Sequence, residues 1–501
     1  MTDVSPTSEP VLKQDLLDEA SRPAAVPPPT IWTKLAYGFG SVAYGVKNGA
    51  FDYFLLIFYS QVIGLDARLV GLAILIALIV DALSDPIVGY WSDNLRSPWG
   101  RRHPFMYASA LPVALSFFML WNPPEGASQQ TLFWFVLGFA ILIRTLITLY
   151  ETPSSALTPD LTSDYNQRSS LYSYRYFFGW TGGNAMTVLM FFFLFPAFAT
   201  QAIPDGMFNR EAYELYGIIA SCVIFVAILV SAVGTHARIV HLKQPPPPRR
   251  MSIGRVFGEI FETLAERSFI ALFIGALFGA VASGLAAGLS FYFLTYFWGF
   301  SEVERGLVLF GTFIAAAIGF ILAPIVTRTI GKKRGAMIIG LIAFLGAPMP
   351  IALRLFDLLP PNGTAFIFWF VVITNIIDVG LIICFQILFS SMVADLVEQS
   401  ELKTGRRSEG VFTAAVTFVR KAVQGFGVLA ASMVLALAQF PSGADTSAVP
   451  EEAIWRLGAF YVPAILFLWM AMMAIISTYR IDRATHEDNL RKLSDSGQPA
   501  E

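Results

Sequence analysis

The sequence has little charge and few side chains that bind metals. Only 14% of its 501 residues are charged, and it contains 2 cysteines and 4 histidines. Cys222 and Cys384 each lie inside an apolar segment, a placement typical of small core side chains and not of a disulfide framework or a thiolate metal site. The histidines are in loops or the C-terminal tail without metal-ligand spacing: His103, His236, His241 and His486. We therefore expect neither an enzyme nor a bound cofactor.

The sequence is rich in apolar residues. Hydrophobic residues make up 55% of the chain, and the mean hydropathy is +0.61. These values predict an integral membrane protein, with no indication of nucleic-acid binding. Residues 1–30 are polar and rich in proline, and no basic segment leads into an apolar one. We interpret them as a disordered cytoplasmic tail and not as a signal peptide.

From Leu35 onward, the chain divides into about twelve segments long enough to cross a bilayer. They lie near 35–60, 69–92, 104–122, 131–157, 171–198, 213–235, 269–299, 304–329, 336–355, 365–394, 411–439 and 455–479. This predicts an N-terminal six-helix bundle over 31–235, a linker over 236–268, a C-terminal six-helix bundle over 269–479 and a tail over 480–501.

Basic residues predict the orientation of these segments. They gather in the loops after even-numbered spans: Arg96, Arg101 and Arg102; Arg238, Lys243, Arg249, Arg250 and Arg255; Arg328, Lys332, Lys333 and Arg334; Lys403, Arg406 and Arg407. The opposite loops are short of Lys and Arg. Positive charge favours the cytoplasmic side, so we expect these loops and both termini to be cytoplasmic, in a multi-pass protein of the cell membrane.

The central linker and the loop after each second span suggest an internal repeat. After a proline run, apolar residues recur at helical spacing and predict an amphipathic helix on the cytoplasmic face: Ile253, Val256, Phe257, Ile260, Phe261 and Leu264. PIVGYWSDNLRSPWGRRHP and APIVTRTIGKKRGA follow spans two and eight as matching loops. This six-plus-six pattern resembles the parallel repeats of the major facilitator fold.

Two aspartates in the second span are the most unusual residues of the sequence. Asp81 and Asp85 are four residues apart and so lie on one helix face. Adjacent carboxylates in a membrane can share a proton, bind a cation or pair with Arg or Lys elsewhere. Ser84 and Thr148 could add hydroxyl oxygens. We expect these four residues to form a cation-binding and coupling site.

Other polar residues in the spans are candidates for binding a solute. Arg144 and Glu151 lie in span four with Thr148, and Arg175 lies near the start of span five, where it could pair with Glu151 or with a substrate. Lys421 lies early in span eleven, where it could line a cavity or extend toward the cytoplasm. The candidate substrate-binding residues are Tyr44, Arg144, Glu151, Arg175, Gln386 and Lys421.

Four sequence segments together carry a family resemblance. TKLAYGFG at 33–40, DALSDPIVGYWSDNLRSPWGRRHPF at 81–105, YETPSSALTPDLTSDYNQRSSLYSYRYFF at 150–178 and MVADLVEQSELKTGRRSEG with VTFVRK at 392–421 resemble the melibiose-permease-like glycoside-pentoside-hexuronide:cation symporters. The resemblance implies a coupling-cation site at Asp81, Asp85, Thr148 and Glu151, a sugar-contacting arginine at Arg175 and the lysine of span eleven at Lys421. It also implies sugar symport with Na⁺ or H⁺ by alternating access.

The chain departs from this family mainly at the sugar site. The Lys-Asp pair of the melibiose permeases on helix one is replaced by Tyr44 and Gly45, a stacking tryptophan by Ser155 and an aromatic residue on span ten by Gln386. WSDNLRSPWGRRHPF also resembles a loop of proton-coupled sucrose carriers. A third related group carries lysophospholipids, so a non-sugar amphiphile is an alternative solute. An exporter is the other alternative to a sugar symporter, because the direction of transport follows the gradients and is not encoded in the helices.

The loop after span two predicts a cytoplasmic gate. Asp93, Gly100, Arg101 and Arg102 match the major facilitator motif of this loop, where charge costs little at the membrane edge. We expect an ion-pair latch there that stabilises one access state, with plain topogenic charge as the alternative. We expect the protein to lie in the bilayer, to carry a small solute and to work as a monomer.

Overall fold

The computed structural model describes residues 28–162, 165–239, 267–404, 423, 425–443 and 449–478. Within these ranges the chain is helical and contains no strand. Among the described residues, ten helices are long and apolar enough to cross a membrane, and Gly425–Leu437 is a shorter apolar helix. A helix satisfies its own backbone hydrogen bonds, which a bilayer requires of any spanning segment. The prediction of an all-α, multi-pass membrane fold is confirmed.

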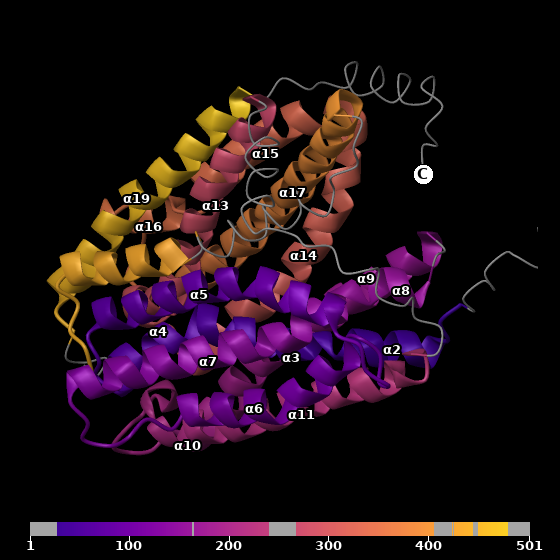
Figure 1. Cartoon of the computed structure of the whole chain (residues 1–501). Coiled ribbons are helices and arrows are strands. Elements are labelled where there is room, and N and C mark those ends of the chain that lie inside the picture. The colour runs from indigo at the N-terminus through magenta and orange to yellow at the C-terminus, as the bar shows by residue number, and fades with distance from the viewer. Residues whose placement is uncertain are drawn as a thin grey trace, which may run out of the picture.

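The N-terminal half of the molecule extends from α2 to α11 (Figure 1). Its elements are α2 (Ile31–Phe39), α3 (Ser41–Gly49), the π-helical η1 (Ala50–Phe54), α4 (Leu55–Ile57), the π-helical η2 (Phe58–Val62), α5 (Ala67–Asn94), α6 (His103–Leu120), α7 (Gln129–Ala156), α8 (Thr158–Leu161), α9 (Tyr165–Leu189), the π-helical η3 (Met190–Leu194), α10 (Phe195–Phe198), the 3₁₀ turn η4 (Gly206–Phe208) and α11 (Arg210–His236).

The C-terminal half extends from α13 to α19. Its elements are α13 (Arg267–Tyr292), the π-helical η6 (Phe293–Phe297), α14 (Glu302–Ile330), α15 (Lys332–Gly346), α16 (Met349–Leu355), α17 (Ala365–Thr404) and α19 (Glu451–Ser477). Gly425–Leu437 is the described part of the predicted span 411–439. The predicted amphipathic helix of the linker, residues 1–27 of the predicted N-terminal tail, the predicted C-terminal tail and Lys421 lie outside the described residues.

The first predicted span, 35–60, is a series of short helical pieces, and glycines explain the close packing around it. A Cβ atom on Gly40, between α2 and α3, would lie 1.8 Å from the Tyr150 hydroxyl. A Cβ on Gly45 would lie 1.9 Å from the carbonyl oxygen of Gly179 on α9. Small residues let membrane helices approach this closely. They bring α3 directly against α9, next to Tyr44 and Arg175.

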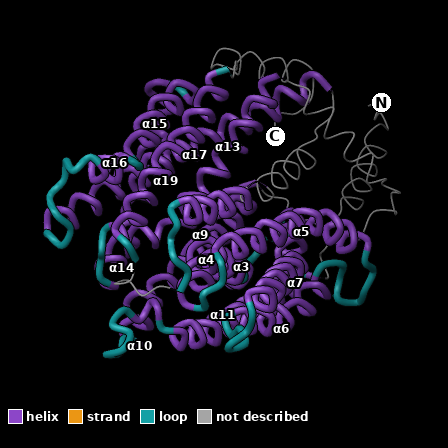
Figure 2. The backbone as a smooth tube through the Cα atoms, turned by 90° about the vertical axis from the view of Figure 1, so that its left-hand side faces the viewer, coloured by secondary structure: helices purple, strands orange, loops and turns teal. Residues whose placement is uncertain are grey.

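The two halves meet at one end and diverge toward the other (Figure 1; Figure 2 shows the view after a quarter turn). Within the N-terminal half, α5 packs on α7 and α6 on α11; within the C-terminal half, α14 and α15 pack on α17. Contacts between the halves join α4 to α13 and η3 to α14. The diverging end is the one that carries the basic loop between α5 and α6, so the predicted cytoplasmic end is the wider one.

Candidate functional site

The two aspartates of α5 face the polar side chains of α7. Asp81 is 1% exposed, whereas Asp85 is half-buried. Across from them, Arg144 and Thr148 lie one turn apart on α7 and are both buried. Because residues four apart share a helix face, each helix presents its pair of polar groups to the other. The predicted juxtaposition of span two and span four is thus present in the structure.

Thr148 connects the two carboxylates, and Arg144 pairs with one of them. The Thr148 hydroxyl is 2.9 Å from Asp81 Oδ1 and 3.1 Å from Asp85 Oδ1, so its one proton is donated to either oxygen or shared. Arg144 Nη1 donates to Asp81 Oδ2 at 3.2 Å, in an ion pair whose side chains are 5% and 1% exposed. The site therefore combines two carboxylates, one hydroxyl and one guanidinium. Sequence reasoning placed Arg144 with the solute, whereas the structure places it on Asp81.

Ser84 and Glu151 border this group. The Ser84 hydroxyl donates to the backbone carbonyl of Asp81 at 2.9 Å, which leaves its lone pairs as acceptors for another group. Glu151 is half-buried on α7, and it has no hydrogen bond or ion pair with another residue in the described part of the chain. Within the predicted cation site, hydrogen bonds therefore connect the side chains of Asp81, Asp85 and Thr148. In the part of the chain that the structure describes, the side chains of Ser84 and Glu151 are not hydrogen-bonded to these three side chains.

Arg175 lies in a separate cluster between α2, α3, α7 and α9. Its Nη1 donates to the Ser154 hydroxyl at 2.8 Å and to the Tyr37 hydroxyl at 3.1 Å. The guanidinium carbon is 5.2 Å from the centre of the Tyr37 ring and 5.8 Å from that of Tyr44. Tyr37 in turn donates to the Ser154 carbonyl at 2.8 Å. These partners are all neutral, and Arg175 is 7% exposed.

The helix packing around Tyr44 and Gly45 leaves no room in this structure for one feature that the family resemblance implies. Tyr44 donates to the Arg175 carbonyl at 3.4 Å and contacts Gly179. An aspartate at position 45 would need its Cβ where the Gly179 carbonyl oxygen lies, because α3 and α9 are packed backbone against backbone. The acidic residue that the resemblance leads one to expect on the first span is therefore excluded by the packing.

The C-terminal half contributes less to the described site. Gln386 is exposed on α17, and the structure does not bring it to any of the residues above. Lys421 lies outside the described residues. Of the six predicted solute-binding residues, Tyr44 and Arg175 form one cluster, while Arg144 pairs with Asp81 and Glu151 lies two turns from Arg144 on α7.

The predicted cytoplasmic gate is an ordered loop between α5 and α6. Arg102 Nη2 pairs with Asp93 Oδ1 at 3.4 Å, with the arginine side chain 6% exposed and the aspartate 52% exposed. Gly100 has a φ of +74°, a left-handed conformation that favours glycine. Its carbonyl accepts a 2.6 Å hydrogen bond from Ser97. Arg101 is half-buried beside them. This ion pair joins neighbouring helices of the N-terminal half.

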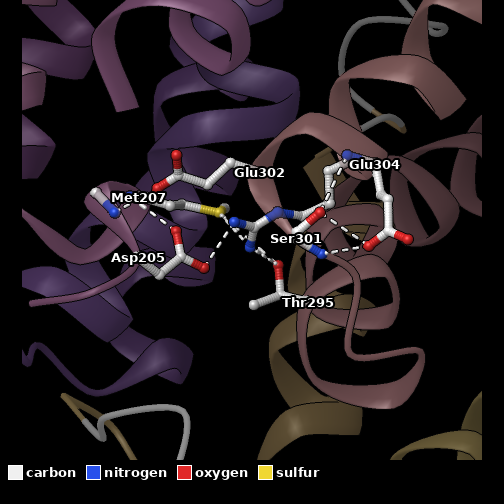
Figure 3. A network of polar contacts seen from close by, with 8 residues as sticks. Asp205, Met207, Thr295, Ser301, Glu302 and Glu304 are labelled. Carbon is white, nitrogen blue, oxygen red and sulfur yellow. Dashed lines mark hydrogen bonds and ion pairs between the residues drawn. The ribbon is translucent and has the colours of Figure 1, made fainter. Parts of the chain in front are cut away.

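A polar cluster at the opposite end of the molecule was not anticipated from the sequence (Figure 3). Arg305, in the first turn of α14, is 0% exposed and donates to Asp205 Oδ2 at 2.6 Å and to the Thr295 hydroxyl at 2.7 Å. Nearby, Glu302 Oε1 accepts from the Gly206 amide at 2.5 Å. Asp205 and Gly206 precede α11, so the cluster ties the N-terminal half to the C-terminal half.

Further polar contacts between the halves lie at this same end. Gln61 accepts a 3.1 Å hydrogen bond from Tyr296 and donates to the Pro441 carbonyl at 3.2 Å. Ser60 and Tyr292 share another hydrogen bond. The halves are therefore fastened to one another at the end away from the basic loops. The ribbons of the two halves diverge at the other end, which carries the basic loop between α5 and α6 (Figure 1).

Comparison with known proteins gives a family match over nearly the whole chain. The family described as "MFS/sugar transport protein" matches residues 36–483. A putative glycoside/cation symporter of Escherichia coli is 24% identical over 476 residues, which cover 93% of this chain and 95% of the relative. The isoprimeverose transporter of Lactiplantibacillus pentosus is 22% identical, covering 90% and 88%. A sodium-dependent lysophosphatidylcholine symporter of Danio rerio is 32% identical over 29% of this chain and 27% of its own length.

Solved structures share the fold. The nucleoside transporter NupG superimposes with a TM-score of 0.58 at 13% identity, covering 88% of this chain and 99% of that protein. A D-xylose-proton symporter superimposes with a TM-score of 0.55 at 14% identity, covering 87% and 97%. At such low identity the likeness concerns the arrangement of helices alone.

Proposed function

We propose that this chain, which belongs to the MFS/sugar transport protein family, couples the uptake of a sugar or glycoside to a cation, Na⁺ or H⁺. The family consists of transporters and not of enzymes, and the chain is a multi-pass membrane protein of this kind. The proposal concerns the class of solute and the ion that drives its uptake. The observation that supports coupling to a cation is the pair of carboxylates at Asp81 and Asp85, joined by the hydroxyl of Thr148.

Charge explains why this pair suits a coupled carrier. Carboxylates inside a membrane protein are expensive, and those present in spans usually mark ion or substrate pathways. With Arg144 beside Asp81, one bound monovalent cation would offset the charge of the second aspartate of the pair. A site whose charge is offset in this way passes through the alternating-access change more easily than the empty one. Coupling follows if the empty site resists that change.

Support for a sugar as the solute comes from two sources. The relatives that cover most of the chain carry names of glycoside/cation and isoprimeverose transport. In the structure, Arg175 lies between two tyrosine rings and two hydroxyl groups, a setting that offers both hydrogen bonds and aromatic surface to a polyhydroxylated solute.

Access to this cluster fits uptake by alternating access. In the state described here, the halves are fastened at the end away from the basic loops by the Arg305 cluster and by Gln61. A solute would enter from outside in the opposite state, in which these contacts are broken, and would leave toward the cytoplasm in the present one. Asp93 and Arg102 are proposed to stabilise one of the two states.

Reconstituted vesicles test the proposal. Purified protein would be placed in liposomes, and uptake of a panel of radiolabelled glycosides would be followed under an inward Na⁺ gradient and, separately, an inward proton gradient. We expect at least one glycoside to accumulate above its external concentration under one of the two gradients, with empty liposomes as the control. Accumulation of lysophosphatidylcholine alone would favour an amphiphile carrier. Gradient-driven loss of preloaded solute would favour an exporter, and no movement of any glycoside would overturn the sugar proposal.

A further inference from the structure

The ion pair between Arg144 and Asp81 is the unusual feature of the proposed cation site. Arg144 Nη1 is 3.2 Å from Asp81 Oδ2, and the guanidinium carbon lies 4.6 Å from the centre of the Phe51 ring on its other side. Both charged side chains are almost fully buried. The aromatic ring, the carboxylate and the surrounding helices hold the guanidinium in place, and a second carboxylate, Asp85, lies one helical turn away.

Such a guanidinium competes with a metal ion for the same oxygen atoms. Na⁺ binds hard oxygen ligands and would need carboxylate oxygens from Asp81 and Asp85 together with the hydroxyl of Thr148. Arg144 already occupies one Asp81 oxygen, and Thr148 contacts the other at 2.9 Å. A cation seated between the two aspartates would also lie within a few ångströms of a like charge in a region of low dielectric, where repulsion is strong.

We propose that Arg144 is a specificity-determining residue that disfavours Na⁺ at this site, because its guanidinium takes the position of a metal ion on Asp81. The inference rests on the proposed function only in identifying Asp81, Asp85 and Thr148 as the place where the coupling cation binds. Na⁺ could enter the site fully only after Arg144 left Asp81, and the buried guanidinium would then lose its carboxylate partner.

Replacing Arg144 by a neutral side chain should therefore create a Na⁺ site. In Arg144→Gln, the two carboxylates keep the hydroxyl of Thr148 but lose the guanidinium that pairs with Asp81. We expect Na⁺ to bind this variant at least about tenfold more tightly than it binds the wild type, since removing one like charge at such short range is worth that much or more. Arg144→Lys keeps the charge and should remain insensitive to Na⁺.

Thermal unfolding of the full-length protein in detergent measures this without any solute. The melting temperature would be followed as NaCl replaces choline chloride at constant ionic strength. The expected result is a rise for Arg144→Gln and no rise for wild type, since a ligand that binds the folded state stabilises it. Arg144→Gln combined with Asp81→Asn should lose the response. Arg210→Gln is the matched control, because Arg210 pairs with Glu214 at the far end of the molecule.

Two outcomes would overturn the inference: a wild-type protein whose melting temperature rises with Na⁺ as much as that of Arg144→Gln, or a folded Arg144→Gln protein with no response. If Arg144→Gln does not yield a monodisperse protein, uptake and Na⁺ titration of the wild type alone test the inference. Na⁺-driven glycoside uptake by the wild type then contradicts the inference while supporting the proposed function. An absence of any uptake contradicts the proposed function. The Na⁺ titration of the melting temperature then still tests whether Arg144 disfavours Na⁺.

Discussion

Two buried arginines in the N-terminal half are stabilised in different ways. Arg144 pairs with the carboxylate of Asp81 and stacks on Phe51, so its charge is balanced by an acid. Arg175 is held by the hydroxyls of Tyr37 and Ser154, which are neutral. The difference indicates that the two arginines have different roles. An arginine already balanced by a carboxylate belongs to the cation site, whereas one held only by hydroxyls can still attract the polar groups of a solute.

Removing the acid of the first pair should have the largest effect. Asp81→Asn leaves Arg144 buried beside a neutral amide, and breaking a buried ion pair by removing one partner costs about 3–5 kcal/mol. Thermal or chemical unfolding in detergent would measure this loss. Asp81→Asn combined with Arg144→Met removes both charges and should recover most of the stability. Equal stability of the single variant and the wild type would mean that the ion pair contributes nothing to the fold.

Arg175→Gln should act on the solute and much less on the fold. Its partners are hydroxyls, which can rearrange around an amide, so we expect little change in stability. Loss of hydrogen bonds from a charged group to the solute costs about 1.5–3 kcal/mol, which would raise KM roughly tenfold to a hundredfold. Uptake kinetics in liposomes would measure it. Arg175→Lys, which keeps the charge, should lie between wild type and Arg175→Gln; an unchanged KM in both variants would remove Arg175 from the solute site.

Thr148→Val should weaken the cation site while leaving the arginine cluster intact. The substitution keeps the shape of the side chain but removes the donor that both carboxylates share. An unsatisfied buried acceptor costs about 1–3 kcal/mol, so the affinity for the coupling cation should change about tenfold. The dependence of uptake on cation concentration would show it, with Thr148→Ser as the matched control. A shift in KM for the solute alone would speak against this difference in roles.

Asp93→Asn should have the smallest effect on stability. Its carboxylate is 52% exposed, and ion pairs of an exposed side chain contribute at most about 1 kcal/mol. If the pair latches one access state, the variant should change uptake rates by a small factor with little change in melting temperature. Rates identical to those of wild type would favour the simpler interpretation, in which Arg102 only sets the orientation of the loop.

The sequence was sufficient to predict the helices, and the family resemblance placed residues of α5 and α7 in one site. Long apolar segments identify spans directly, and a spacing of four residues places Asp81 with Asp85 and Arg144 with Thr148 on shared faces. It could not show that Arg144 reaches Asp81, because helical periodicity defines the face of a helix and not its neighbour. Helical periodicity also could not show whether Gln386 on α17 lies near the Arg175 cluster.

The contacts that fasten the halves were harder to foresee. Arg305 and Asp205 are 100 residues apart, and Asp205 lies in a loop. The sequence does contain a hint: Ser301 and Glu304 form a capping box that fixes the start of α14, and Arg305 follows at once, before a long apolar segment. A charged residue in the first turn of such a helix can also simply face solvent. Only the three-dimensional arrangement shows that Arg305 is buried.

The most direct test of the account concerns Asp85. In liposomes with an imposed Na⁺ or proton gradient, accumulation of the transported solute would be compared between wild type, Asp85→Asn and Asp66→Asn. Asp66 is a matched control outside the site, where hydrogen bonds from Arg68 hold the pKa of its carboxyl below the usual value. The account predicts that Asp85→Asn exchanges solute across the membrane without concentrating it, whereas Asp66→Asn concentrates it normally. Accumulation by Asp85→Asn equal to that of wild type would contradict a coupling role for this carboxylate pair.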